Sequence, residues 1–451
     1  MRAKAHLKAS HREYRPFINN GTGVDVILPV IVTDDGVLNI FAQYLYLNRS
    51  KSRSWQDSAT FAVQLLLEYT EVKHSYFDNP TILFEAFADA LHTGTIEGNV
   101  DLSNLWWQPR QPEDASKLIG HITGLSDWIA KITENEKAQL NPWRHATAHE
   151  QRLNWAAYSH KRDNAFLSHL WKTDARAMES RSVRSLTLPV ERTTPLKAFP
   201  DDKLQLLASN GFRHRGSLTT AKHNLRDILI TYLIHYGGLR LSEALSLWCD
   251  DVTVEGGEVI VRVFHPQYGL TSDGIMRATH LDRKYGLKSR NTLVKSNDAL
   301  HLGWKDCLIT DPDRRCFEVF FYPNHAALEF GEMWREYHLT QRVKPQIEGN
   351  HPYAFTTRAG LPYSHRMYRD AHKRAIERVG MVYGKMLGTT PHGHRHAYGQ
   401  RLAADGASAL TIKLAMHHKS INSSQTYTQP TSSQMRRSLL DLEERLRVKH
   451  L

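Results

Sequence analysis

Apolar residues recur every three or four positions through the N-terminal third of the chain, as they do in helices that bury one face. The clearest case is 37–48, where Leu38, Phe41, Tyr44, Leu45 and Leu47 follow this spacing. The same spacing predicts helices over 57–69, 81–92, 115–132 and 150–158. We therefore expect an N-terminal domain built mostly from helices.

Changes in composition and in hydrophobic pattern divide the chain into regions. Residues 1–36 lack a regular pattern apart from a strand-like run at 24–33, and we interpret them as an N-terminal arm before a helical domain at 37–174. Residues 175–200 are rich in Arg, Ser, Thr and Pro, which is typical of a basic interdomain linker. The last domain, 201–451, shows helical patterns, a β-hairpin over 250–264, a short strand at 307–310, an insertion around 265–301 and a terminal helix at 432–448. The predicted fold class is mainly α with a small antiparallel β-sheet (α+β).

The charge balance favours a polyanionic partner. The chain has 58 Lys and Arg against 47 Asp and Glu, a formal net charge of +11. Its longest apolar stretch, Val26 to Val32, is interrupted by Pro29, whereas a membrane-spanning helix needs about 20 apolar residues. The three cysteines lack zinc-ligand spacing, and no secretory leader is evident, so we expect a cytoplasmic protein without a membrane partner.

Three short motifs carry chemistry. The first is Gly238-Leu-Arg240-Leu-Ser242-Glu243, at the start of a helical pattern. The second is the histidine-rich run from His392 to His396, which contains Arg395. The third begins at His418 and is followed nine residues later by Tyr427. Each motif alone is weak, because an arginine three residues before a glutamate is usually a surface ion pair.

Together, in this order, the motifs resemble the tyrosine recombinase (phage integrase) family, with its G-x-R-x-S-E, H-x-x-R-H and H-x-S-I boxes and a tyrosine nine residues after the last histidine. The resemblance covers roughly 195–429 and includes smaller matches at Phe355, Gly360, Pro362, Ser364, Gly406 and Ile412. It implies a helical core-binding-like domain before a catalytic domain. It also implies a site-specific recombinase that joins DNA through a 3′-phosphotyrosyl intermediate without ATP, metal or cofactor.

The resemblance also implies the catalytic residues and partners. Tyr427 is the nucleophile, His392 the base and Lys305 the acid that protonates the leaving 5′-oxygen, and the phosphate is held by Arg240, Arg395 and His418. Guanidinium groups stay charged and present paired donors to phosphate oxygens, while tyrosine needs help to react at neutral pH. Glu243 is expected to buttress Arg240, and His396 to orient its neighbours. The implied partners are double-stranded DNA and three further copies of the chain, as a homotetramer in a synaptic complex.

Two departures from the family pattern stand out. Met416-His417 occupies the place of the usual Leu-Gly, which puts a bulky ring beside His418. The catalytic lysine is ambiguous, because Lys284, Lys288, Lys295 and Lys305 all follow the hairpin. We favour Lys305, after a glycine turn and before the expected strand at 307–310, with Lys288 second.

Other interpretations remain open. A topoisomerase-like enzyme would use the same chemistry without synapsis. A DNA-binding protein that has lost catalysis is a further alternative, against which the presence of both arginines, both histidines and the tyrosine argues. His392, His394 and His396 would share one face if they lay on a strand, as in a histidine-ligated metal hydrolase. The run that follows them favours a helix instead, on which alternate side chains diverge. In the first domain, Trp106-Trp107 favours core packing over base stacking.

Overall fold

The chain separates into two units, Met1–Glu191 and Arg192–Leu451. The computed structural model describes residues 10–18, 25–163, 178–183, 197–213, 223–293, 298–305, 307–346, 350–428 and 436. The boundary at 191/192 falls inside the expected linker, 175–200, of which only 178–183 and 197–200 are described. The expected terminal helix, 432–448, lies outside the described residues apart from Arg436.

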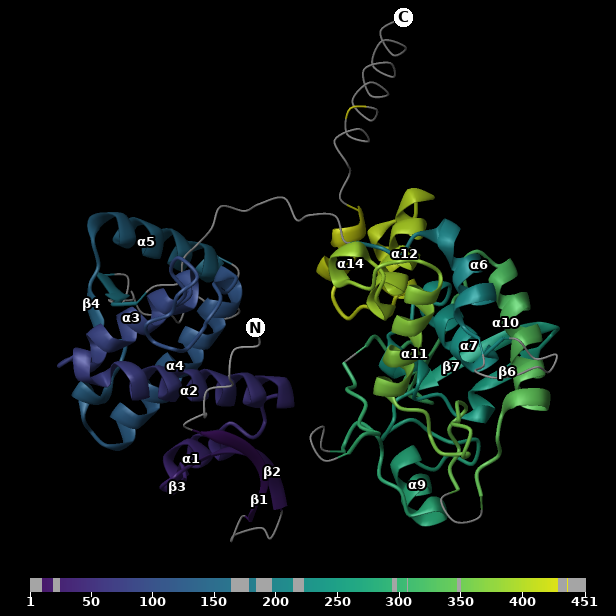
Figure 1. The fold of residues 1–451 in the computed structure, drawn as a ribbon, viewed down its shortest axis with the longest axis horizontal. Helices are drawn as coiled ribbons and strands as arrows, with labels where there is room; N and C mark the ends of the chain where they lie inside the picture. Colours follow the sequence, from purple (N-terminus) through teal and green to yellow (C-terminus); the bar gives the residue numbers. More distant parts are fainter. Residues whose placement is uncertain are drawn as a thin grey trace, which may run out of the picture. The chain divides into compact units, whose positions relative to one another are not determined.

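The first unit is mostly helical, as the apolar spacing predicts. Ser52 caps one helix by accepting a hydrogen bond from the backbone N–H of Trp55 at 3.3 Å, and Asn79 caps the next with Pro80 at its first position. The helices, drawn in blue tones in Figure 1, are α1 (Asn39–Leu47), α2 (Arg53–Lys73), α3 (Pro80–Thr93), α4 (Pro112–Ile132) and α5 (Ala148–Asp163), with turns η1 (His74–Tyr76) and η2 (Glu136–Ala138).

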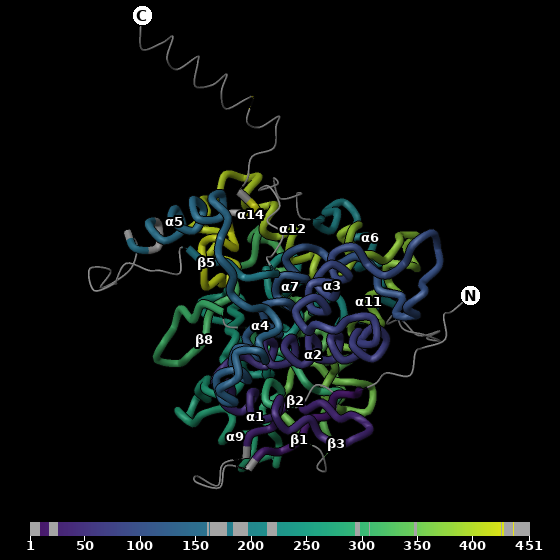
Figure 2. Tube along the Cα trace, turned by 90° about the vertical axis from the view of Figure 1, so that its left-hand side faces the viewer, coloured from purple at the N-terminus to yellow at the C-terminus, as the bar shows by residue number. Residues whose placement is uncertain are grey.

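The expected N-terminal arm is wrong for the described part of 1–36. Strands β1 (His11–Ile18), β2 (Asp25–Thr33) and β3 (Gly36–Val37) form an antiparallel sheet in the order β1-β2-β3. The buried residues of β2 pack in one core with those of α1, so the sheet belongs to the first unit (Figure 2). A second small sheet pairs β4 (Trp143–His145) with β5 (Glu179–Arg181).

The adjacent tryptophans of the first unit have different environments. Trp107 is buried, with its ring centroid 5.9 Å from that of Tyr69 and 6.1 Å from that of Phe87, so core packing is confirmed for it. Trp106 is 42% exposed, and its indole N–H donates to the Asn104 side chain. Only one of the two rings therefore belongs to the core.

The second unit surrounds a three-stranded sheet. The predicted hairpin is present as β6 and β7, joined by Gly256 and Gly257, whose φ angles of +59° and +87° suit a two-residue turn. The expected strand at 307–310 is absent, so that prediction was wrong; the third strand, β8, begins at Cys316 instead. The strands are β6 (Val252–Glu255), β7 (Glu258–Phe264) and β8 (Cys316–Glu318), in the order β6-β7-β8.

The helices of the second unit pack around this sheet and around α7, whose buried residues include Leu229 and Leu233. The expected insertion, 265–301, contains a helix that the sequence pattern missed. The helices are α7 (Leu225–His235), α8 (Leu241–Ala244), α9 (Arg277–Tyr285), α10 (His325–Glu336), α11 (His365–Arg378), α12 (Pro391–Ala404), α13 (Ala409–Ala415) and α14 (Asn422–Thr428) (Figure 1). Shorter pieces are η5 (Asp201–Lys203), α6 (Leu204–Leu206), η6 (Leu207–Gly211), η7 (Cys249–Asp251), η8 (Tyr337–Gln341) and η9 (Lys385–Leu387).

A buried ion pair holds the insertion to the hairpin. The Arg277 guanidinium of α9 donates to both carboxylate oxygens of Asp251, and both side chains are almost fully buried. In the parts of the chain that the structure describes, no helix combines the length and the apolar character needed to cross a membrane.

Candidate active site

A tight turn after α7 positions Arg240. Gly238 has a φ of +65°, and a Cβ at this position would lie 2.5 Å from the ring of Tyr398, so the turn requires glycine. Arg240 then caps α8. Its backbone N–H donates to Oε2 of Glu243 at 2.7 Å, and its Nη1 donates to Oε1 at 2.6 Å. Glu243 therefore fixes both the backbone and the side chain of Arg240.

Arg395 of α12 lies on the other side of the same carboxylate. Its Nη1 atom is 3.8 Å from Oε2 of Glu243, and its side chain is only 3% exposed. The guanidinium also donates to the carbonyl oxygens of Gly238 and Met416, the latter at 2.7 Å. Two cations from distant segments are thus held around one buried carboxylate.

The tyrosine contacts a different histidine from the one that we expected. The hydroxyl of Tyr427, on α14, lies 3.0 Å from Nδ1 of His396. The ring of His392 is one helical turn away, with its centroid 4.2 Å from that of His396. Burial raises the pKa of Tyr427, while Arg395 and Arg240 oppose the rise. The hydroxyl is therefore protonated at neutral pH and needs a base.

Both histidines are unprotonated at neutral pH and so have a nitrogen available to accept a proton. Burial, together with the charges of Arg395 and Lys385, lowers the pKa of His396 to about 4. Partial desolvation lowers the pKa of His392 to about 4 as well, although its side chain reaches solvent at the rim, and nearby cations add to the effect. At pH 7 both rings are neutral in the free protein.

His417 does not displace His418. Its φ of +54° is the left-handed conformation that glycine adopts readily, and its ring turns away to stack on Phe317 at 3.9 Å. Among the described residues, neither ring nitrogen of His417 has a hydrogen-bond partner. His418 is free to bond Ser424, with Nδ1 2.8 Å from the hydroxyl oxygen. The stacked ring explains how a bulky residue fits where the family pattern has glycine.

A cavity of about 660 Å³ opens beside the two arginines. Arg240, Arg395, His392 and Lys305 line it, and none of its described lining residues is a carboxylate. The sequence patterns missed five further polar lining residues, namely His365, Arg369, Tyr383, Lys385 and Thr390. Lys385 lies only seven residues before His392, so its closeness in sequence was the available signal. The cavity is cationic, which suits a phosphate-bearing ligand.

The competing lysines differ in position. Lys305 lines the cavity from an irregular segment and not from the expected hairpin strand. Lys284 and Lys288, at the end of α9 and just after it, are not among the lining residues. Lys295 lies outside the described residues. Lys305 and Lys385 are thus the described lysines at the cavity.

The alternating histidines do not share a face, because α12 is a helix. His394 points into the core, where its Nδ1 lies 3.0 Å from Nδ1 of His235 and its Nε2 lies 2.9 Å from Nε2 of His372. His372, His394 and His235 thus form a column of contacting rings. At its outer end, Nε2 of His235 lies 2.6 Å from Nη2 of Arg401 and 3.1 Å from Asp201. Among the described residues, no three His, Cys, Asp or Glu side chains are grouped to hold a metal ion. Part of the histidine-rich composition is thus structural.

Comparison with known proteins finds a family match within the second unit. The model of the phage integrase family matches residues 326–434, which include His392, Arg395, His418 and Tyr427. Tyrosine recombinase XerC of Staphylococcus saprophyticus is 24% identical over 174 residues, which are 36% of this chain and 56% of that protein, so the match spans little more than half of the relative.

Two solved structures are also similar. The XerH site-specific recombinase, bound to palindromic difH substrate in a post-cleavage complex, has a TM-score of 0.47 at 13% identity, covering 86% of this chain and 79% of that one. The Tn1549 transposon integrase in complex with circular intermediate DNA has a TM-score of 0.35 at 16% identity, covering 80% and 99%. The match to the phage integrase family model covers residues 326–434 of the 451-residue chain, so this part of the second unit is similar to that family.

Proposed function

We propose that this chain is a tyrosine-type site-specific DNA recombinase with Tyr427 as its nucleophile. The observation that carries the proposal is the 3.0 Å contact between the Tyr427 hydroxyl and His396, on the same helix as Arg395. A nucleophile, a neutral base and two phosphate-binding cations are thereby held by neighbouring helices of one unit. This is the minimal set for displacement at a phosphodiester.

In the proposed reaction, the Tyr427 oxygen forms a bond to the scissile phosphorus while the bond from phosphorus to the 5′-oxygen breaks. The tyrosine proton passes to His396, and Lys305 gives a proton to the leaving oxygen. Arg240 and Arg395 stabilise the charge that develops on the nonbridging oxygens. The phosphotyrosyl bond retains the energy of the original bond, so the reverse step rejoins DNA without ATP.

Assigning the base to His396 revises the role expected for His392. Nδ1 of His396 is within hydrogen-bond distance of the hydroxyl, whereas His392 is adjacent to His396 and lines the cavity. We propose that His396 accepts the tyrosine proton and that His392 contacts the phosphate. A bound phosphate anion would raise the pKa of both rings and so make each a stronger base.

Lys305 and Lys385 are the candidates for the acid, and a leaving-group substitution separates them. A sulfur at the 5′-bridging position leaves without protonation, so it restores cleavage only when the missing group is the acid. We expect this substrate to rescue Lys305→Ala but not Lys385→Ala. Rescue of Lys385→Ala alone would transfer the role to that lysine.

We further propose that both units contact double-stranded DNA and that four copies of the chain assemble on two DNA sites. The net charge of +11 supports a phosphate-rich partner, and contacts to phosphates make binding strongly salt-dependent. Strand exchange between two sites needs a nucleophile for each of four strands, hence the tetramer. Mass measurement of the DNA complex tests the stoichiometry.

The decisive experiment uses a nicked suicide substrate made from the DNA that flanks the gene. We expect a covalent adduct on a denaturing gel that is lost in Tyr427→Phe. Tyr322→Phe is the matched control, because that hydroxyl donates to Asp405 at 2.7 Å and not to a residue of the proposed site. An adduct that persists in Tyr427→Phe refutes the proposal. Relaxation of plasmids lacking the site, without strand exchange, would indicate a topoisomerase instead.

A further inference from the structure

A second cationic pocket lies in the same unit, away from the proposed catalytic cavity. It has a volume of about 340 Å³ and shares no lining residue with the catalytic cavity. Arg226, at the start of α7, lines this pocket, whereas Arg240 follows the other end of that helix. A helix of this length spans roughly 16 Å, so the two pockets are separate sites.

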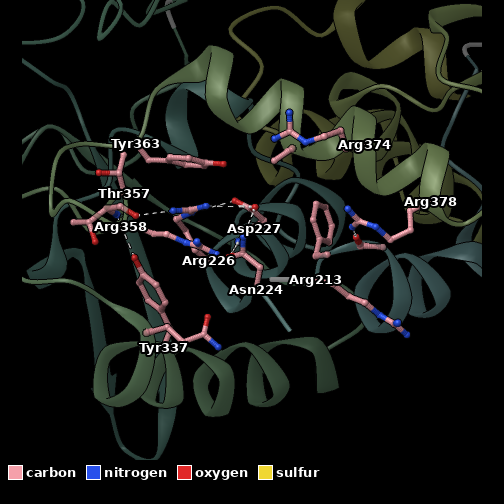
Figure 3. Close-up of a pocket in the computed structure, with 15 residues that line it drawn as sticks. Arg213, Asn224, Arg226, Asp227, Tyr337, Thr357, Arg358, Tyr363, Arg374 and Arg378 are labelled. Atoms are coloured by element: carbon pink, nitrogen blue, oxygen red, sulfur yellow. Dashed lines mark hydrogen bonds and ion pairs between the residues drawn. The ribbon is translucent and has the colours of Figure 1, made fainter. Parts of the chain in front are cut away.

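Five arginines from four segments line the pocket: Arg213, Arg226, Arg358, Arg374 and Arg378. Figure 3 shows Arg226 near the centre, with Arg358 on one side and Arg213, Arg374 and Arg378 on the other. Arg374 and Arg378 lie one turn apart on α11 and therefore share a face. Such convergence of like charges is unfavourable unless an anion offsets it.

The protein itself supplies little negative charge here. Asp227 is the single carboxylate among the described lining residues, and it is buried and already bonded. Its Oδ1 accepts from Nε of Arg226 at 3.1 Å, and its Oδ2 accepts from the Asn224 side chain at 2.6 Å. This pair offsets the charge of Arg226, and no other described carboxylate lines the pocket to offset Arg213, Arg374 and Arg378.

The central arginine is held rigidly in place. Nη1 of Arg226 donates to the carbonyl of Thr356 at 2.8 Å, and its guanidinium carbon lies 3.7 Å from the ring centroid of Tyr363. Arg378 donates to the carbonyl of Gly211, and Arg213 donates to the Asn210 side chain at 2.6 Å. Preorganised guanidinium groups recognise tetrahedral oxyanions through paired hydrogen bonds.

We infer that this arginine pocket binds a phosphate group in addition to the one at the catalytic cavity. A water molecule takes up about 30 Å³ of liquid, so the pocket has room for a phosphate with part of its ester. The phosphate comes either from the DNA backbone or from a free phosphorylated molecule. The inference follows from the pocket alone and stands whether or not Tyr427 cleaves DNA.

The test is a calorimetric titration of the full chain with pyrophosphate, in an Arg240→Ala background that weakens binding at the catalytic cavity. We expect one saturable site that Arg374→Ala/Arg378→Ala weakens roughly tenfold or more. Arg335→Ala, on the exposed side of α10, is the control for lost charge and should bind as the background does. Arg374→Glu, at an exposed position, should abolish binding because it places a negative charge in the pocket.

The source of the phosphate is identified with a duplex lacking any target site. If the DNA backbone supplies it, the double variant lowers the salt dependence of binding by about one to two phosphate contacts. If a free molecule supplies it, DNA binding is unchanged while pyrophosphate binding is lost. Unaltered binding of both pyrophosphate and DNA by the double variant and by Arg374→Glu overturns the inference.

Discussion

Nδ1 of His396 lies 3.0 Å from the hydroxyl of Tyr427, and the two side chains come from α12 and α14 of the same unit. Because the ring is neutral at pH 7 and the hydroxyl is protonated, this contact is a ready path for the tyrosine proton. The proposed chemistry depends on it more than on any other contact.

The first prediction concerns this base. His396→Gln keeps a polar group near the hydroxyl but cannot accept its proton, so covalent cleavage should slow by about 10²- to 10³-fold at pH 7. In the wild type, cleavage should fall as the pH drops through the pKa of His396 in the DNA complex, and the variant should lack this limb. Single-turnover adduct formation across pH measures both. Near-normal cleavage by His396→Gln, with loss in His392→Gln, would return the role to His392.

The second prediction concerns the carboxylate between the arginines. Glu243→Gln leaves two guanidinium groups without a buried counter-charge, so the free energy of unfolding should fall by about 3 kcal/mol and cleavage should be lost. Glu377→Gln is the matched control, because its ion pair with Lys373 is exposed and 3.7 Å long. That change should cost less than about 0.5 kcal/mol. Urea unfolding measures both, and equal effects would contradict the role given to Glu243.

The third prediction concerns Gly399, against which the nucleophile packs. A Cβ there would lie 2.7 Å from Cε1 of Tyr427 and 2.9 Å from Sδ of Met416. Gly399→Ala should therefore displace the tyrosine ring and reduce adduct formation by roughly tenfold or more. Gly120→Ala, also inside a helix but with open space around the added methyl group, should instead stabilise the fold by about 0.5 to 1 kcal/mol. Full cleavage by Gly399→Ala would show that the ring has room to move.

The fourth prediction concerns acid sensitivity. Burial lowers the pKa of His338 to about 4, below the ordinary value near 6.5. Between these two values the unfolded chain binds a proton that the folded chain does not, so stability falls as the pH drops below about 6.5. His338→Phe removes this contribution and should make the unfolding free energy less dependent on pH between 6.5 and 4. The change in unfolding free energy that His338 contributes per pH unit should stay well below the limit of about 1.4 kcal/mol, because the ring is partly solvated.

His325→Phe serves as the control for that experiment. His325 lies at the exposed start of α10, so its replacement controls for the exchange of a histidine for a phenylalanine outside the core. Denaturant midpoints at several pH values between 7.5 and 4.5 measure the slopes. Parallel curves for the wild type and His338→Phe would contradict the prediction.

Local patterns predicted many of the helices and the hairpin, because the burial of one helical face and the Gly256-Gly257 turn depend on residues that are close in sequence. Strand β1 was missed, since His11–Ile18 has few apolar residues and depends on its pairing with β2. The expected strand after Lys305 failed for a related reason: a short apolar run forms a strand only where a partner edge is available.

The proposed site shows the same limit. Motif spacing selected Arg240, Arg395, His418 and Tyr427, and the fold brings their segments together. Spacing could not decide which of two histidines one turn apart faces the tyrosine, because α14 determines that from another part of the chain. The sequence likewise could not predict the left-handed backbone of His417, because the ring is accommodated there by stacking on Phe317, which is distant in sequence.

The column formed by His235, His394 and His372 behaves as a single unit. A neutral imidazole has one N–H, so the three rings must donate in series along the column. In the first direction, His235 accepts from Arg401 and the rings donate inward, toward His372. In the second direction, the rings donate outward, and His235 donates to Asp201. The first direction leaves an N–H on Nδ1 of His372, which is buried without a partner in the described part of the chain and costs about 1 to 3 kcal/mol. The second direction sets an N–H of His235 against the Arg401 guanidinium. Each direction of donation therefore has one unfavourable contact, at opposite ends of the column. Loss of the negative charge of the half-exposed Asp201 would remove the acceptor for the outward direction, and all three tautomers would then reverse together.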